Sequence, residues 1–218
     1  MTHGIAPLAR YDHTLTTMGS SLVMAGGRNA AGEVFSDLWL FDVATKVWSS
    51  IGSLPRGSFG HAAAYCSTTN KLFVLGGYNY EDGFLGSLSA CTVSMNADTY
   101  GVGPAASCID VTTGCAGVEG SVSLQAVGFE PRHQHAMVAF EGHLYVYGGS
   151  EGDGPAAPRL FKYDPVACVA SVSPLAEAVG VYEGIVGAMA SGAFVHGGFK
   201  GPEGNYELGA YPVYAIPL

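Results

Sequence analysis

The sequence predicts an all-β protein built from four repeated units, and three observations carry this prediction. A short apolar segment ends in a pair of glycines four times along the chain, at 22–27, 72–77, 144–149 and 193–198. The first glycines of the pairs are residues 26, 76, 148 and 197, so the intervals between them are 50, 72 and 49 residues. Glycine makes up 32 of the 218 residues, and no segment keeps a helical period over three turns. A repeat of about 50 residues with several strands in each unit is typical of a β-propeller blade.

The four units are expected to be the blades of a single domain, at about 10–55, 56–131, 132–180 and 181–218. A four-stranded sheet has two apolar faces, so each blade must stack on its neighbours to bury both. The 72-residue interval indicates an insertion in the second blade at about 94–120. We expect the fourth strand of that blade to resume at 121–127.

The glycine pair is expected to end the second strand of each blade, where the chain turns tightly. One glycine of each pair should need a positive φ, which glycine adopts at little energetic cost. In an antiparallel blade, the end of strand two and the loop that leads into strand one lie on the same face of the propeller. We call this the glycine face. The loop between strands three and four, and with it the insertion, belongs to the opposite face.

Further residues recur around the glycine pairs. Three units open with arginine and histidine, in the pairs Arg10 and His13, Arg56 and His61, and Arg132 and His135. Strands that combine aromatic residues with a final aspartate follow at 37–42 and 160–164, and the first unit continues with Trp48 and Pro55. This pattern resembles the kelch repeat over essentially the whole chain. The second unit departs from it at 88–93, which lacks the aromatic residue and the aspartate, and the fourth has 182–185 in place of arginine and histidine.

The resemblance implies a propeller that binds protein or peptide ligands on the glycine face. The residues predicted to contact such a ligand come from the loops leading into strand one and from the loops after the glycine pairs. They are Arg10, Arg56, Phe59, Tyr78, Tyr80, Glu81, Arg132, His133, Tyr182 and Tyr206. Three converging arginines would suit a carboxylate or phosphate, because guanidinium offers a planar fork of donors. The repeated His13, His61 and His135 are interpreted as structural.

Catalysis has little support in the sequence, so the predicted function is a non-catalytic interaction module without a cofactor or metal. Some kelch-like proteins are enzymes, and an enzyme or metal site at the channel mouth is therefore the alternative. Glu151, Asp153 and His133 are the nearest approximation to a metal-binding group. A second alternative is a truncated structural remnant of a larger kelch protein.

Composition restricts the partners. The chain has 18 acidic and 9 basic residues and a formal net charge of −9, which disfavours nucleic acid and anionic membrane surfaces. No segment approaches the roughly 20 apolar residues that cross a bilayer, and residues 1–5 do not have the pattern of a secretory signal. We therefore expect a cytoplasmic protein. Its five cysteines are interpreted as free thiols, with Cys108 and Cys115 as a possible exception.

The last unit predicts an open ring. It reaches a third strand at about 211–215, and no fourth strand follows. The segment 4–8 is a poor substitute, because Pro7 cannot donate a ladder hydrogen bond. We expect an incomplete propeller whose terminal blades expose apolar faces and favour self-association.

Overall fold

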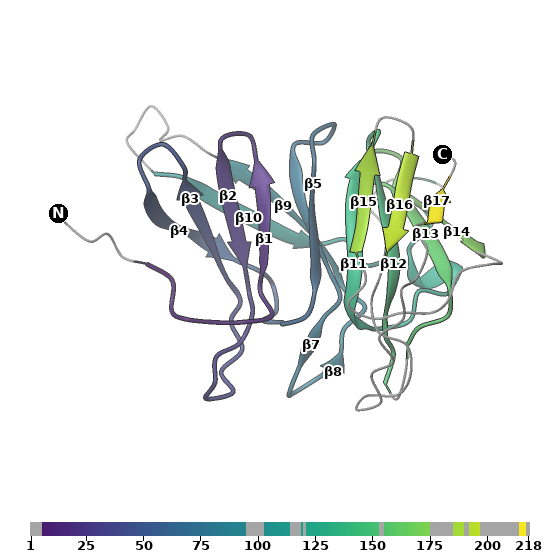
Figure 1. Ribbon diagram of the computed structural model, residues 1–218, viewed down its shortest axis with the longest axis horizontal. Helices are drawn as coiled ribbons and strands as arrows, with labels where there is room; N and C mark the ends of the chain where they lie inside the picture. Colours follow the sequence, from purple (N-terminus) through teal and green to yellow (C-terminus); the bar gives the residue numbers. More distant parts are fainter. Residues whose placement is uncertain are drawn as a thin grey trace.

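The computed structural model of the chain describes residues 6–94, 103–113, 119, 121–152, 155–174, 185–189, 192–196 and 214–216. Four antiparallel sheets stand side by side in an arc that does not close into a ring, as Figure 1 shows. No α-helix occurs among these residues, and the single helical element is a 3₁₀ turn, η1 (Gln125–Val127). The predicted all-β, open propeller is confirmed.

Each sheet follows the chain from strand to strand, with the first strand of each blade on the inner side of the arc. The first blade contains β1 (Thr14–Met18), β2 (Ser21–Ala25), β3 (Asp37–Asp42) and β4 (Val47–Ser53). The third contains β11 (His133–Phe140), β12 (His143–Ser150), β13 (Arg159–Asp164) and β14 (Val169–Pro174). The described part of the fourth sheet consists of β15 (Ile185–Met189), β16 (Gly192–His196) and β17 (Tyr214–Ile216). The first strands β1, β5, β11 and β15 contact one another in sequence along the arc.

The second blade differs from the prediction. It contains β5 (Ala62–Cys66), β6 (Lys71–Leu75), β9 (Leu88–Ser94) and β10 (Ala105–Asp110). The fourth strand therefore lies inside the predicted insertion, and the expectation of a strand at 121–127 was wrong. β10 pairs with β9 over its whole length, whereas 121–127 forms an irregular segment that ends in η1. A short hairpin, β7 (Tyr78–Asn79) and β8 (Gly83–Phe84), extends from the glycine face (Figure 1).

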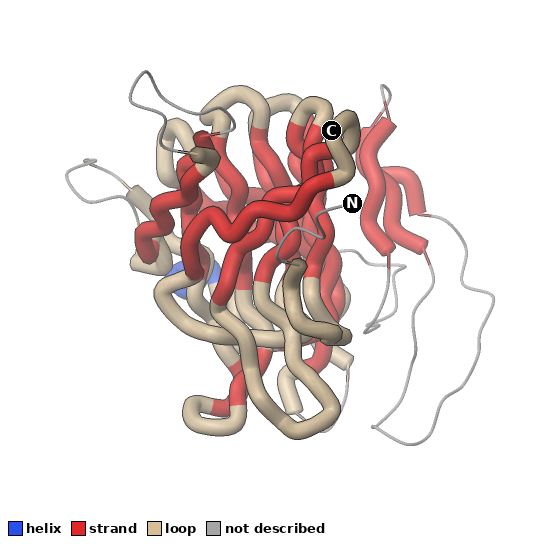
Figure 2. Tube along the Cα trace, turned by 90° about the vertical axis from the view of Figure 1, so that its left-hand side faces the viewer, coloured by secondary structure: helices blue, strands red, loops and turns tan. Residues whose placement is uncertain are grey.

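Two apolar clusters hold the first three blades together. Between the first and second blades, Val23, Leu38 and Leu40 pack against Leu72 and Val93. Between the second and third blades, a larger cluster joins residues such as Phe73, Leu88, Val146 and Phe161. The tube in Figure 2 shows the strands as stacked layers with the loops gathered at their ends. Stacking thus buries the sheet faces that a single blade would leave in water.

The glycine pairs explain how closely the blades approach. In the three glycine pairs that the structure describes, both members have positive φ, for example 64° at Gly76 and 98° at Gly77. The predicted φ > 0 thus extends to both members of these pairs. A Cβ on Gly76 would lie 2.7 Å from the carbonyl oxygen of Arg132 in the next blade. A Cβ on Gly77 would lie 2.9 Å from the carbonyl oxygen of Phe59, just before the first strand of its own blade. The first glycine therefore leaves space for the backbone of the next blade. The second leaves space for the lead-in loop of its own blade.

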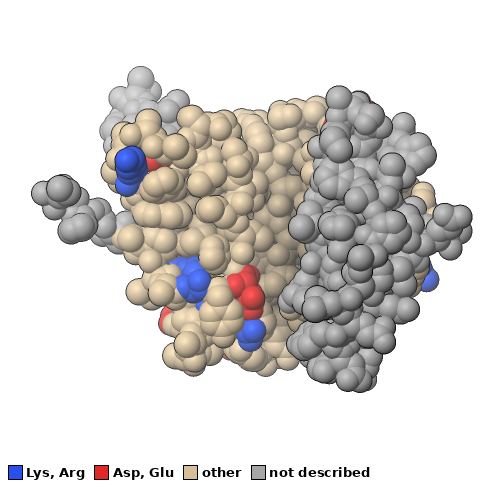
Figure 3. All heavy atoms as spheres, viewed as in Figure 1, with Lys and Arg blue, Asp and Glu red and all other residues tan. Residues whose placement is uncertain are grey.

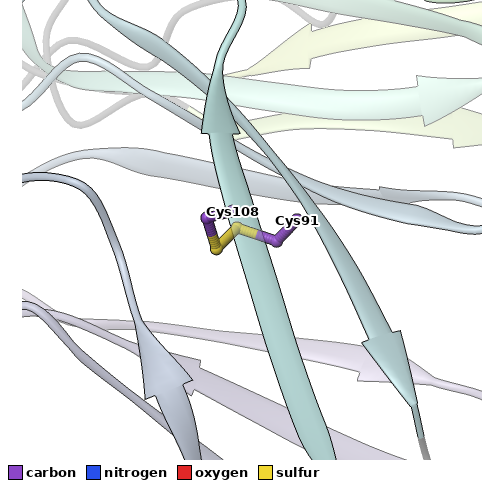
Figure 4. The surroundings of a disulfide bond; sticks show 2 residues. All are labelled: Cys91 and Cys108. Atoms are coloured by element: carbon purple, nitrogen blue, oxygen red, sulfur yellow. A yellow bond between two sulfur atoms is a disulfide. The ribbon is translucent and has the colours of Figure 1, made fainter.

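The prediction of free thiols was wrong for Cys91 and Cys168, and Cys108, which was named as an exception, pairs with Cys91. Cys115, the other named exception, lies outside the described residues. Cys91 and Cys108 are directly opposite on β9 and β10 and form a disulfide (Figure 4). Cys168 is also disulfide-bonded, and Cys66 is free and buried. Spacing along the chain could not reveal the first pair, because strand register brings the two residues together. The expected cytoplasmic location loses the support that free thiols would have lent it.

The part of the chain that the structure describes contains no helix long and apolar enough to span a membrane.

Candidate functional site

The register of the repeats is set by backbone hydrogen bonds between neighbouring blades. The amide of Gly27 donates to the carbonyl of Ser58 at 2.9 Å, and the amide of Gly77 donates to the carbonyl of Arg132 at 2.8 Å. Ser58 and Arg132 are therefore equivalent, and each precedes the repeated histidine of its unit by three residues. Arg10 has the same spacing from His13, whereas Arg56 lies five residues before His61. The three arginines are not equivalent.

Arg10 and Arg132 are structural. The side chain of each is 2% exposed. Arg10 donates to both carboxylate oxygens of Asp37 and to the carbonyl of Gly26, and its guanidinium lies over the ring of Phe35. Although burial opposes it, hydrogen bonds from Arg10 and from the indole of Trp39 hold the pKa of Asp37 below its usual value. This ion pair anchors the start of β3 to the lead-in loop.

Arg132 repeats this arrangement in the third blade. It donates to the carbonyl of Gly148 at 3.2 Å, forms an ion pair with Glu151, and lies over the rings of Phe129 and Phe161. Burial lowers the pKa of its guanidinium, and the nearby Glu151 opposes that effect. The side chains of Arg10 and Arg132 are both enclosed by their own blades, which does not favour the predicted contact with a ligand.

Arg56 is the exception. Its side chain is 55% exposed, and Nη1 lies 2.8 Å from Oδ2 of Asp82. Asp82 also accepts from the side-chain amide of Asn79 at 3.0 Å. The side-chain oxygen of Asn79 in turn accepts from the amides of Glu81 and Asp82, which shapes the turn between β7 and β8. Arg56 thus remains on the glycine face, already paired with an acidic residue of the hairpin.

Two of the three repeated histidines lie in the interior. His61 approaches the hydroxyls of Ser58 and Thr14 at 3.2 and 3.1 Å, and its ring would meet a Cβ on Gly26 of the preceding blade at 2.9 Å. His135 stands in the same relation to Gly76. Burial lowers the pKa of His61 to about 4 and that of His135 to about 3. Both histidines are neutral at pH 7 and act as packing elements between blades.

Side chains from the first three blades, all aromatic except one arginine, form a continuous row on the glycine face. The row consists of Tyr11, Arg28, Phe59, Tyr78, Tyr80, Phe84 and His133. Its members come from equivalent places, because Tyr11, Phe59 and His133 each precede a repeated histidine by two residues. Arg28 and Tyr78 each follow a glycine pair.

Contacts within the row are close. The guanidinium of Arg28 lies 4.0 Å from the ring centroid of Phe59 and 4.8 Å from that of Tyr11. It also donates to Asp12 and to the Tyr80 hydroxyl, both at 2.9 Å. Tyr78 contacts Phe59, Tyr80 and Phe84 at centroid distances of 5.5, 6.0 and 5.2 Å. Tyr80 is 55% and Tyr11 46% exposed, so the row presents two accessible rings on a fixed base.

Two pockets flank the Arg56–Asp82 ion pair, and both are lined by this pair. The Tyr80 pocket, of about 570 Å³, is further lined by Val34, Tyr80 and Glu81. The Asp110 pocket, of about 440 Å³, reaches down to Leu54 and Leu85 and carries Asp110 at its rim. Figure 3 shows acidic and basic side chains side by side toward the lower edge of the view, where β7 and β8 lie in Figure 1.

The predicted site residues therefore separate into groups. Phe59, Tyr78, Tyr80 and His133 are brought together in the row, and Arg56 and Glu81 lie beside it. Tyr182 and Tyr206 lie outside the described residues, as does Asp153 of the suggested metal group. Within the described residues, no three histidine, cysteine or acidic side chains are grouped so as to hold a metal ion.

Sequence reasoning missed Asp110 and Leu54 as pocket residues. Asp110 was assigned to an insertion, although it ends the fourth strand of the second blade on the glycine face. Leu54 follows the fourth strand of the first blade and donates its amide to Ser36. The Arg56 spacing was visible in the sequence, and counting from the histidine would have separated it from Arg10 and Arg132.

Known proteins share parts of this chain. The tRNA wybutosine-synthesizing protein 4 of Candida albicans is 34% identical over 94 residues, which are 43% of this chain and 13% of that protein. Its counterpart in Saccharomyces cerevisiae is 42% identical over 73 residues, covering 33% of this chain and 10% of that protein. Acyl-CoA-binding domain-containing protein 5 of Arabidopsis thaliana is 28% identical over 163 residues, which are 73% of this chain and 22% of that protein. The chain thus corresponds to a small part of each relative.

A family model covers far more of the chain. The KLHDC2/KLHL20/DRC7 Kelch-repeats domain matches residues 12–205. This range includes the glycine pairs, the buried Arg132, which is equivalent to Arg10, and the histidines that pack between blades. The chain belongs to the kelch-repeat family.

Proposed function

We propose that this chain is a non-catalytic interaction module that binds a protein or peptide through its glycine face. The observation that carries the proposal is the aromatic row. Arg28 joins rings of the first and second blades, and Tyr78 and Phe84 contact His133 of the third. Tyr11 and Tyr80 remain accessible at the surface of the row. Membership of the kelch family supports an interaction module in general terms.

The rigidity of the row favours binding. An exposed tyrosine that is already ordered loses little side-chain entropy when a partner covers it. Tyrosine and arginine are also the residue types most often found at the energetic centre of protein interfaces. Tyr80 is fixed at its hydroxyl by Arg28 and contacts Phe59 at 5.5 Å, yet more than half of it is exposed.

The polar groups of the same face support binding over catalysis. Arg132 is paired with Glu151, and His61 is buried between two hydroxyls. The tRNA-modifying and acyl-CoA-binding relatives share only a short part of their length with this chain. We therefore take from them the repeat and not the activity in their names.

A photo-crosslinking amino acid placed at residue 80 tests the proposal. We expect cross-links between the full chain and a protein partner, and competition by excess unlabelled chain. The matched control places the same amino acid at Val166, which is 64% exposed in the turn between β13 and β14 on the opposite face. Cross-linking from position 166 but not from position 80 would move the binding surface to the other face.

The enzyme alternative has its own test. Elemental analysis of the purified chain should find no stoichiometric iron or copper. A bound metal that disappears in a variant with Glu151, His133 and Asp153 all changed to alanine would favour a metal-dependent activity instead.

A further inference from the structure

Four arginines of the glycine face are engaged by acidic residues of the same chain. Arg10 binds Asp37, Arg28 binds Asp12, Arg56 binds Asp82, and Arg132 binds Glu151. A ligand carboxylate or phosphate would have to displace one of these partners. This weakens the reason for expecting an acidic ligand, which rested on three converging arginines, Arg10, Arg56 and Arg132.

Each of the two pockets retains one carboxylate beyond the shared ion pair. The ionisable side chains lining the Tyr80 pocket are Arg56, Asp82, Glu81 and the Tyr80 phenol. In the Asp110 pocket they are Arg56, Asp82 and Asp110. Since Arg56 and Asp82 neutralise each other, Glu81 and Asp110 leave a negative charge in each pocket. Both residues are exposed, so both can meet a partner.

Tyr80 adds a second feature that selects a cation. Its ring stands beside Glu81 in the same pocket, and more than half of the side chain is exposed. The face of a tyrosine ring attracts a Lys ammonium or an Arg guanidinium. A cation held between an aromatic face and a carboxylate gains from both interactions.

We infer that the partner of the glycine face is a basic peptide segment, an inference that rests on the proposed function. It places a Lys or Arg side chain in the Tyr80 pocket, between Tyr80 and Glu81. A second basic residue of the segment reaches Asp110 across the Arg56–Asp82 pair. The apolar floor of the Asp110 pocket, formed by Leu54 and Leu85, accepts the aliphatic part of that side chain.

Selection of random dodecapeptides displayed on phage, with the full chain immobilised, tests this inference. Enriched peptides are expected to carry Lys or Arg more often than Asp or Glu. One selected peptide, synthesised with a fluorescent label, should lose about tenfold in affinity with Glu81→Gln and with Tyr80→Ala. Raising NaCl from about 50 to 500 mM should weaken binding further.

Glu141→Gln is the matched control, because Glu141 is an exposed carboxylate in the β11–β12 turn on the opposite face. It should leave the affinity unchanged. Charge reversal in Glu81→Lys should shift the selection toward acidic peptides. Thermal melting of each variant shows whether a loss of binding is a loss of fold.

Three outcomes would overturn the inference. Enrichment of acidic peptides whose binding is stronger with Glu81→Gln would refute the basic partner while leaving peptide binding on this face intact. Selected peptides that bind all variants equally would refute the glycine face as the site, and with it the proposed function. Failure to enrich any peptide over several rounds would count against peptide binding altogether.

Discussion

A histidine is repeated in the loops that lead into the first three blades, but its surroundings in the first blade differ from those in the second and third. His61 and His135 are buried against the first glycine of the preceding blade. His13 has the same place in its unit and is exposed. The second glycine behaves alike in both regions, since Gly27 packs on His13 as Gly77 packs on His61. Thus each blade organises its own lead-in loop, whereas burial of the histidine requires a neighbour on that side.

The sheet faces repeat this difference. In the second blade, Leu72 and Val74 point toward the first blade and are 0% and 4% exposed. In the first blade the equivalent face carries Leu15 and Leu22 beside Phe41 and Trp48. Leu15 is 52% exposed there. The repeat therefore supplies a stacking surface whether or not a described blade covers it.

The largest expected effect is at the glycine that separates two blades. Gly76→Ala should destabilise the chain by about 3–5 kcal/mol, because the new Cβ meets backbone of the next blade in addition to the strain of positive φ. Gly19→Ala is the control, since Gly19 has φ +58 and nothing within 4 Å of a Cβ. It should cost only about 1–2 kcal/mol. Equal losses in urea denaturation would show that φ alone accounts for the repeated glycine.

The next effect concerns the histidines at neutral pH. His61→Ala should lower the free energy of unfolding by about 3 kcal/mol, because it opens a cavity and leaves the Ser58 hydroxyl without its partner. His13→Ala should change it by less than about 0.5 kcal/mol, as expected for an exposed residue. Denaturation of the two variants at pH 7.5 measures the difference. Similar losses would mean that His13 is also covered in solution.

Acid should act on the buried histidines. The pKa of His61 is about 4 in the folded chain, and its ordinary value is about 6.5. Between these values the unfolded chain binds the proton more tightly, so stability is complete above about pH 6.5 and falls as the pH drops toward 4. By pH 4.5 the loss from His61 should reach about 3 kcal/mol. Chemical denaturation from pH 7.5 to 4.5 should show a shallower decline for His61→Gln than for the wild type, and identical slopes would contradict this account.

The smallest effect is association through the uncovered face of the first blade. We expect light scattering to detect concentration-dependent dimers or larger species, because apolar sheet faces of this kind associate. Leu15→Glu should reduce that association several-fold. Val166→Glu adds the same charge at another exposed apolar residue and should leave the association unchanged. A monomer at every concentration would show that the face is tolerated in water.

The local sequence pattern was enough to predict most of the architecture. Four glycine pairs, each after an apolar strand, predicted the blades and the positive φ, since both follow from residues adjacent in the chain. The Arg–His spacing also contained the distinction between Arg56 and the buried Arg10 and Arg132, although the first interpretation treated them alike.

Contacts between distant segments required the tertiary structure. The Cys91–Cys108 disulfide and the position of β10 depend on the register of two strands separated by an insertion, and composition does not encode that register. The charge that the site offers to a ligand also depends on contacts between distant segments. A sequence counts arginines, but only the fold shows that Arg10, Arg28, Arg56 and Arg132 have acidic partners. This leaves Glu81 and Asp110 to meet a ligand.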